Sequence, residues 1–402
     1  MASLAAAALG GCAARPPTGA PPTSTDSSTV STGTPESPAT AVTTATPTAR
    51  PDPPSSVDAD WPMPAADPGR SSAVLDAAGP TDRPAALWET EADATLTQPV
   101  LAGGALYVGA SDGRLLAFDA RTGDRRWERP VGAPAARPWV LDGSVYAPTA
   151  DGVVAFDAGG TERWRVPTPN RAGLAVASHG LYWLADGDAA TVVALARSDG
   201  SERWRTTLDG PWKPPVFASE DRVFVSSGTH DYRFWQLGPE TGDRLGEGPR
   251  DGNDFPAEHC YRDGAVFAAD AFFGNVYATP VAEGRSGWSQ GVDGLGRAAM
   301  SADGERAYYL ATHGDAPGLY ALSAADGSVE WTAEFTTEQV HPPVVADETI
   351  LVRSADALRC FDPADGAERW TRPVDDVGPG VVVADDLVFT ADGAALRAFR
   401  PP

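Results

Sequence analysis

The chain has 402 residues, 42% of them hydrophobic, and a formal net charge of −24 at pH 7, so it is long enough to bury a sizeable core. The negative charge excludes partners held through phosphate groups, because nucleic acid and anionic membrane surfaces would repel this protein. Beyond a short apolar start, no run of about 18 apolar residues occurs, and the sequence predicts no membrane-spanning helix.

The start of the chain carries a cysteine among small residues. Leu9-Gly10-Gly11-Cys12 follows four alanines and resembles a lipobox, in which small residues admit the peptidase that cuts before a lipid-carrying cysteine. The resemblance implies a signal peptide over residues 1–12 and a mature protein held at the outer face of the cytoplasmic membrane by lipid on Cys12. No Arg or Lys precedes Cys12, so the positive segment of a signal peptide is missing. An alanine-rich start without this role is the alternative.

A polar stretch and a short extension follow. Residues 13–58 are rich in Thr, Ser, Pro and Ala and hold almost no side chain large enough to bury, which predicts a disordered tether. Residues 59–84 form an N-terminal extension, in which we expect order to resume near Asp60-Trp61-Pro62.

From residue 85 onward the sequence repeats itself. Trp127 closes a run of short motifs, namely Tyr107-Val108-Gly109, Asp112-Gly113, Ala117-Phe118-Asp119 and Thr122-Gly123, and the same order returns before later tryptophans. Positions equivalent to Trp127 recur at intervals of roughly 40 residues. They are Trp88, Trp127, Trp164, Trp204, Leu245, Trp288, Trp331 and Trp370, and they predict eight repeats.

Each repeat predicts one four-stranded antiparallel sheet. Three alternating apolar runs are separated by Asp-Gly or Gly-rich turns, a fourth run carries the tryptophan, and no helical period appears. Because such units are typical of propeller blades, we expect an all-β, eight-bladed propeller over residues 85–402. Leu87–Thr90 lacks three strands before it and Val381–Phe399 lacks a tryptophan strand after it, so the two should complete one blade and close the ring. Seven blades is the alternative, since Leu245 is degenerate.

The repeat resembles the PQQ-binding-like, quinoprotein-type β-propeller family, and the resemblance covers Ala85 to Pro402. A tryptophan on each outer strand can pack its ring against the neighbouring blade. We therefore expect a structural, blade-docking role for Trp88, Trp127, Trp164, Trp204, Trp288, Trp331 and Trp370. A platform on which a ligand stacks is the alternative.

The resemblance implies two possible functions. Alcohol and sugar dehydrogenases of this family carry a quinone and calcium, whereas the eight-bladed lipoprotein of the outer-membrane β-barrel assembly machine is a scaffold without chemistry. Here no Cys-Cys pair occurs, and Cys260 and Cys360 stand in different repeats. Asn253-Asp254 and Asp270 are the candidate ligands for calcium, but with 55 acidic residues in the chain such a match is expected by chance. Haem-attachment, nucleophile-elbow, zinc-helix and phosphate-loop motifs are missing from the sequence. We predict no cofactor, no metal and no catalytic residue, with a PQQ- and calcium-dependent dehydrogenase as the alternative.

The balance of charged residues is unusual. The chain has 31 basic and 55 acidic residues, and Lys213 is its single lysine. This composition is similar to that of proteins from halophilic archaea, whose acidic surfaces hold water and counterions. A GC-rich genome, which replaces Lys by Arg, is the alternative.

Two kinds of loop meet at one end of the channel of a propeller: those from each outer strand to the next inner strand, and those from the second strand to the third. We call this end the funnel face. The sequence departs from its repeat in these loops and places cationic and aromatic residues there: Arg137, Trp139, Trp212, Lys213, His230, Tyr232, His259, Phe272, Phe273, Arg297, His313 and His341. Such groups predict a site for an anionic or sugar-like ligand, or for an acidic loop of a partner. Local pairing with the many carboxylates is the alternative. We expect a monomer that binds an unknown protein partner or small extracellular ligand, meets the membrane only through its lipid anchor and does not bind nucleic acid.

Overall fold

The computed structural model describes most of the chain beyond residue 51. The described residues are 52–167, 170–185, 190–208, 216–226, 234–247, 256–270, 274–281, 287–295, 299–337, 341–354, 356–374, 378 and 380–402. The predicted lipobox with Cys12, and the tether up to residue 51, lie outside them. Within the described part, no helix is long and apolar enough to cross a membrane.

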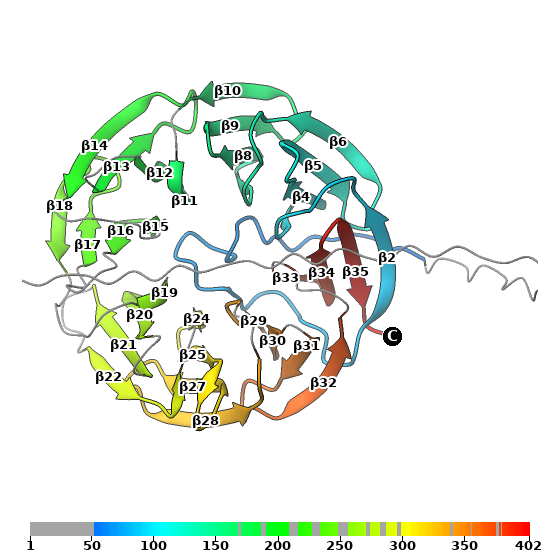
Figure 1. Ribbon diagram of the computed structural model, residues 1–402, viewed down its shortest axis with the longest axis vertical. Helices are drawn as coiled ribbons and strands as arrows, with labels where there is room; N and C mark the ends of the chain where they lie inside the picture. Colours follow the sequence, from blue (N-terminus) through cyan, green and yellow to red (C-terminus); the bar gives the residue numbers. More distant parts are fainter. Residues whose placement is uncertain are drawn as a thin grey trace, which may run out of the picture. The chain divides into compact units, whose positions relative to one another are not determined.

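The described residues from 52 to 402 belong to one compact unit, in which eight antiparallel sheets are arranged as a ring (Figure 1). The strands of blades 1 to 4 are β3 (Val100–Ala102), β4 (Ala105–Gly109), β5 (Arg114–Asp119), β6 (Arg125–Pro130), β7 (Trp139–Leu141), β8 (Ser144–Thr149), β9 (Gly152–Asp157), β10 (Glu162–Val166), β11 (Asn170–Ala177), β12 (Gly180–Ala185), β13 (Ala190–Leu195), β14 (Glu202–Leu208), β15 (Val216–Ala218), β16 (Val223–Ser226), β17 (Phe234–Leu237) and β18 (Arg244–Glu247).

The strands of blades 5 to 7 are β19 (Pro256–Arg262), β20 (Ala265–Asp270), β21 (Asn275–Pro280), β22 (Trp288–Gly291), β24 (Ala299–Ala302), β25 (Arg306–Ala311), β27 (Gly318–Ser323), β28 (Val329–Glu334), β29 (Val344–Ala346), β30 (Thr349–Arg353), β31 (Ala357–Phe361) and β32 (Glu368–Pro373). A short ribbon of β23 (Gly294–Leu295) and β26 (His313–Gly314) lies beside blade 6. The middle strands are apolar on both faces because each blade packs against two neighbours, as in the fully buried β4.

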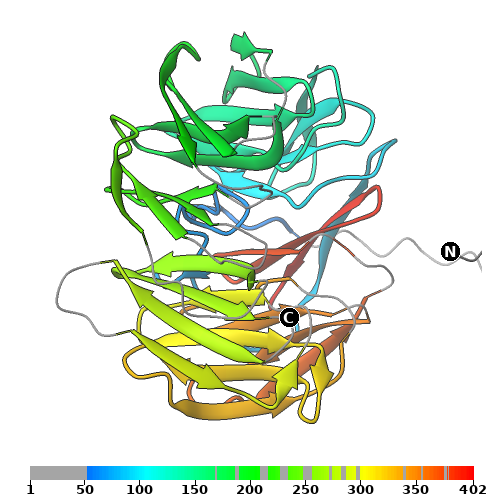
Figure 2. The same cartoon turned by 60° about the vertical axis from the view of Figure 1, so that its left-hand side comes forward.

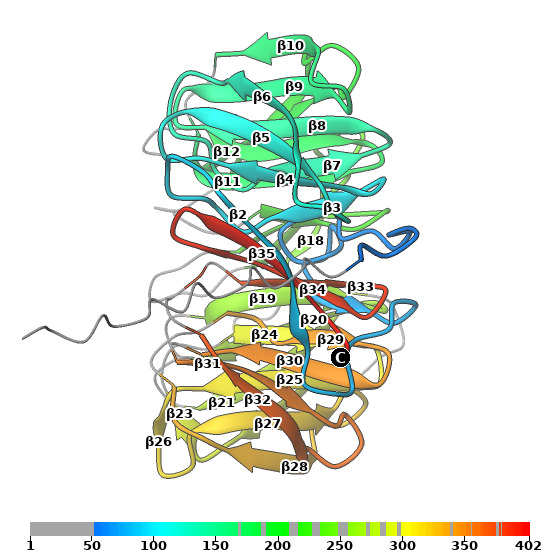
Figure 3. The same ribbon diagram turned by 90° about the vertical axis from the view of Figure 1, so that its right-hand side faces the viewer.

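Blade 8 joins the two ends of the described chain. Its inner strands are β33 (Val381–Ala384), β34 (Leu387–Asp392) and β35 (Ala395–Arg400), and its outer strand is β2 (Ala85–Glu91). β2 pairs with β35 in antiparallel register from Ala85 opposite Arg400 to Glu91 opposite Ala395, and Figures 2 and 3 show the blue strand beside the red hairpin. The predicted eight-bladed propeller and its closure are confirmed, and the seven-bladed alternative is wrong.

Tryptophans link consecutive blades. The Trp88 indole lies over Gly123 in the turn of blade 1, whose φ of 73° suits glycine and whose Cβ would collide with the ring. Its Nε1 donates to the carbonyl of Ala120 at 3.0 Å. The indoles of five other tryptophans donate in the same way to a carbonyl of the next blade: Trp127, Trp164, Trp204, Trp288 and Trp331. Trp370 donates to the carbonyl of Pro80, in the chain that leads into β2. The equivalent Leu245 is 51% exposed, so the link after blade 4 lacks an indole.

A segment before the first blade fills one end of the channel. We call Val57–Pro80 the inner strap; Figure 1 shows it in blue inside the ring. It passes the inner strands in ring order: Trp61 exchanges two backbone hydrogen bonds with Leu101 of blade 1, and the Ala78 carbonyl accepts from Asp386 of blade 8. Between these ends its carbonyls accept from Val140, Ala218, Tyr261, Ala302 and Val345 of blades 2, 4, 5, 6 and 7.

The inner strap is buried where it crosses the channel. Trp61 and Met63 are 1% and 2% exposed, and β1 (Ala73–Val74) adds a parallel strand to β29. The strap meets the inner strands of these seven blades toward their carboxyl ends, near the first hairpins, so it lies at the end of the ring opposite to the funnel face. We call that end the hairpin face.

The acidic composition predicts a salt-dependent fold. A net charge of −24 repels itself once screening fades, and the Debye length grows from ~3 Å at 1 M salt to ~30 Å at 0.01 M. We expect the melting temperature, followed by circular dichroism, to fall steadily as sodium chloride is diluted from multimolar to millimolar. A melting temperature that stayed flat over this range would show that the charge is incidental to stability.

Candidate functional site

The described residues hold five of the twelve predicted funnel-face residues. Trp212, Lys213, His230, Tyr232, Phe272, Phe273 and Arg297 lie outside them, as does Asn253-Asp254. The five that are described, Arg137, Trp139, His259, His313 and His341, occupy three different settings.

Trp139 and His259 belong to the core. Trp139 begins β7 and is 6% exposed among apolar residues of blades 2 to 4. His259 lies in the middle of β19, is 3% exposed, and stacks its ring on Phe217 of the neighbouring blade at 6.2 Å between centroids. Burial, with a smaller contribution from Arg70, lowers the His259 pKa to about 3, so this imidazole is neutral at pH 7 and serves the packing between blades 4 and 5.

His313 lies apart from these residues. It is exposed on the short strand β26, opposite Leu295, and its Nδ1 is 2.5 Å from the hydroxyl of Thr312. The ribbon of β23 and β26 lies beside blade 6, and His313 is not part of the channel cluster described next.

Arg137 and His341 are brought together at the funnel end of the channel. His341 is partly buried just before β29, and its pKa is lowered to about 4, first by burial and then by the positive charges of Arg137 and Arg353. A hydrogen bond with the backbone of Gly378 acts in the opposite direction. His341 is therefore neutral at pH 7, and the positive charge of this end comes from arginines.

The centre of this cluster is a buried ion pair that the sequence analysis missed. Arg353 at the end of β30 donates from Nη2 to Oδ1 of Asp392 at the end of β34, at 2.7 Å, with side chains 1% and 4% exposed. Oδ2 of Asp392 accepts from Nη1 of Arg397 at 2.8 Å and from the hydroxyl of Thr390 at 3.3 Å. Arg397 in turn pairs with Glu89 of β2 at 3.0 Å, so the network crosses from blade 7 to the closing strand.

A signal for this pair exists in the repeat itself. Arg353 and Asp392 are the last residues of the second strands of blades 7 and 8, a position held by Gly109, Thr149 and Ala185 in blades 1 to 3. Opposite charges at one repeat position in adjacent blades indicate a contact between those blades.

The network limits what chemistry this end of the channel can perform. A calcium site would need carboxylate oxygens that are available to the ion, but both oxygens of Asp392 already accept hydrogen bonds from arginines. Among the described residues, no group of three or more His, Cys, Asp or Glu could hold a metal ion. Asp392 therefore does not fit the calcium ligand that a quinoprotein would need.

Comparisons with known proteins agree with this architecture. The family model described as outer membrane protein assembly factor BamB (PQQ_2) matches residues 80–154, 149–250 and 273–397. The serine/threonine-protein kinase AfsK of Streptomyces griseus is 35% identical over 151 residues, which are 33% of this chain and 18% of the kinase. The chain thus spans less than a fifth of that relative.

Two solved structures share the fold. BamB from Moraxella catarrhalis superposes with a TM-score of 0.63 and 13% identity, over 79% of this chain and 100% of that one. Quinohemoprotein alcohol dehydrogenase from Comamonas testosteroni gives 0.65 and 14%, over 85% of this chain and 81% of the enzyme. At these identities the structures establish the propeller alone, whereas the family model covers well over half of the sequence: the chain belongs to the PQQ-type repeat family described as outer membrane protein assembly factor BamB.

Proposed function

We propose that this protein is a non-enzymatic, envelope-anchored propeller, a monomer that binds a partner protein or a small extracellular ligand at its funnel face. Lipid on Cys12 would hold it at the outer face of the cytoplasmic membrane, and residues 13–58 would act as the tether. The family's description as an assembly factor supports a role in holding another protein. Arg137 beside His341 supplies the positive charge that an acidic loop or an anionic ligand would meet.

The observation that carries the non-enzymatic assignment is the saturation of Asp392. A general base or a metal ligand must reach the reacting group or the ion with an available oxygen. Here the buried carboxylate at the funnel end of the channel is held between Arg353 and Arg397, and its bonds fix two blades instead of a substrate.

The quinoprotein dehydrogenase of the same fold is the alternative function, and one assay separates the two. The purified protein is incubated with pyrroloquinoline quinone and calcium, and then with alcohols and sugars in the presence of an artificial electron acceptor. We expect acceptor reduction at the rate of the protein-free blank. Quinone-dependent turnover above that protein-free rate would overturn the proposal. A parallel reaction with protein but without calcium shows whether the ion is needed.

A further inference from the structure

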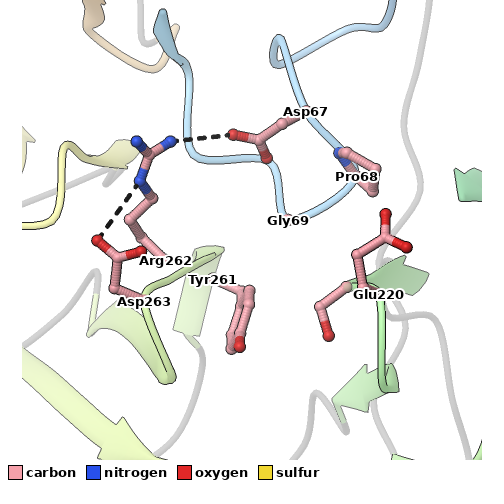
Figure 4. A pocket seen from close by; sticks show the side chains of 8 residues that line it. Asp67, Pro68, Gly69, Glu220, Tyr261, Arg262 and Asp263 are labelled. Carbon is pink, nitrogen blue, oxygen red and sulfur yellow. Dashed lines mark ion pairs between the residues drawn. The ribbon is translucent and has the colours of Figure 1, made fainter. Parts of the chain in front are cut away.

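A second hollow lies on the hairpin face, at the opposite end of the ring from the funnel. It is a cavity of about 230 Å³ between blades 4 and 5. Three separate elements wall it: the turn Asp67–Gly69 of the inner strap, the hairpin Ser219-Glu220 of blade 4 and the hairpin Tyr261–Asp263 of blade 5. Figure 4 shows these side chains around one hollow.

The strap wall is fixed closely to the ring. The Tyr261 amide donates to the Gly69 carbonyl at 2.7 Å, and a Cβ on Gly69 would lie 2.5 Å from the Tyr261 carbonyl oxygen. Asp67 accepts hydrogen bonds from the amide and hydroxyl of Ser71. Burial raises the Asp67 pKa, while those hydrogen bonds and Arg262 oppose the rise. The cavity is therefore preformed.

The charged residues of the lining are mostly acidic. Three carboxylates, those of Asp67, Glu220 and Asp263, face a single guanidinium, that of Arg262. Arg262 forms ion pairs with two of them, from Nη1 to Oδ2 of Asp67 at 3.7 Å and from Nε to Oδ2 of Asp263 at 3.8 Å. Glu220 accepts a hydrogen bond from the Ser178 hydroxyl at 2.7 Å and stays exposed. A cation entering the cavity would meet carboxylates that one arginine does not neutralise.

An aromatic ring completes the wall. Tyr261 is held against Phe224 at 5.1 Å between ring centroids, so its position is set by the core of blades 4 and 5. A ring fixed beside carboxylates attracts an ammonium or guanidinium group by its own quadrupole as well as through their charge.

The size of the cavity decides the kind of ligand. Sites for whole cofactors and drug-sized molecules usually measure about 300–1,000 Å³, so 230 Å³ suits one long side chain. We propose that this cavity receives a lysine or arginine side chain of a partner protein, and that the hairpin face of blades 4 to 6 is a docking surface for a basic segment.

A neighbouring hollow extends this surface. A cavity of about 430 Å³ lies between blades 5 and 6, lined mainly by alanines with Pro280, Gly304 and Glu305. A Cβ on Gly304 would collide with Oδ2 of Asp263, so Asp263 stands between the two hollows. A segment that places a basic residue in the first hollow can place apolar residues in the larger second one.

The charge of the whole molecule favours such a partner. The net charge of −24 draws a basic protein toward this surface over distances set by ionic strength, and the two hollows then supply the short-range contacts. The inference does not rest on the proposed funnel-face function, because the two surfaces lie at opposite ends of the ring.

The test uses a fluorescent, acetylated pentalysine amide as the probe. Its binding to the full chain is measured by fluorescence anisotropy, at the lowest salt concentration that leaves the unfolding midpoint unchanged. The test variant is Glu220→Gln/Asp263→Asn, which keeps both shapes; Asn also tolerates the left-handed φ of 47° at position 263. The matched control is Glu91→Gln/Asp93→Asn, which removes two exposed carboxylates at the funnel end.

We expect pentalysine to bind the wild-type protein, the test variant to bind about tenfold more weakly through the loss of two charge contacts, and the control variant to differ less than twofold. Pentaglutamine should not bind. Equal weakening in both variants would show diffuse attraction to an acidic protein and overturn the proposal, as would pentalysine binding no tighter than pentaglutamine. Equal unfolding midpoints of the three proteins confirm that the comparison is one of folded surfaces.

Discussion

Deletion of residues 2–95 is expected to lower the unfolding midpoint far more than deletion of residues 2–56. The short deletion removes the predicted lipobox and nearly all of the predicted tether, at the cost of two exposed or half-buried hydrogen bonds, from Arg121 to Pro54 and from Arg400 to Asp52. The long deletion removes the inner strap and β2, which opens the sheet edge of β35 and strips seven blades of their strap hydrogen bonds. The loss of Trp88, which is 4% exposed, by itself accounts for ~3 to 5 kcal/mol, against a whole-domain stability of ~5 to 15 kcal/mol.

An intermediate deletion, of residues 2–80, separates the two contributions. It removes the strap but keeps β2 and Trp88, so its midpoint should fall between the other two when urea unfolding is followed by tryptophan fluorescence. Equal midpoints for the 2–56 and 2–95 deletions would mean that β2 does not close the ring in solution. Leu245→Ala, at an exposed position, serves as the neutral control.

The second large effect is expected at the buried ion pair. Asp392→Ala should destabilise the protein by about 3–5 kcal/mol, because it leaves the guanidinium of Arg353 buried without its carboxylate. An arginine cannot escape this cost by losing its proton. The loss of Asp392 costs less free energy at Arg397, because this side chain is more exposed and keeps its ion pair with Glu89.

Two further variants make this result interpretable. Arg353→Met/Asp392→Leu should cost less than Asp392→Ala, because no charge is left buried in the pair. Glu162→Ala, which breaks an exposed pair with Arg165 at 2.9 Å, should cost less than about 1 kcal/mol. If chemical denaturation gave Asp392→Ala and Glu162→Ala the same loss, water must reach the Arg353 site and the pair is not a buried one.

The parts of the fold that repeat could be predicted from the sequence, and those that do not repeat could not. Trp88 has no three strands before it, and Val381–Phe399 has no tryptophan strand after it. The two are the halves of a unit that occurs seven times elsewhere, so the repeat pattern predicts that they close the ring. The inner strap escapes such reasoning because its contacts are made by backbone carbonyls, such as that of Pro68 with Ala218, which almost any side chains allow.

The candidate site shows the same division. The prediction of funnel-face residues rests on residue type, and type does not distinguish His259, which packs in the core, from His341, which borders the channel cluster. Arg353 and Asp392 were overlooked because each looks ordinary in its own repeat. The pair becomes visible when the last residues of the second strands are compared across neighbouring blades.

The inner strap also fixes the order in which the molecule can fold. Val57–Pro80 leaves the ribosome before every strand that it contacts, and the bond from Asp386 to Ala78 waits until nearly the whole chain is made. Contacts this distant in sequence carry a high closure entropy and form late. Blades can assemble one after another during synthesis, and the strap can dock on each as it forms, but β2 and the last bond of the strap must wait until blade 8 is complete. A chain held at its N-terminus and threaded through a membrane would therefore finish folding only on the far side, in a single late step that joins its first strand to its last.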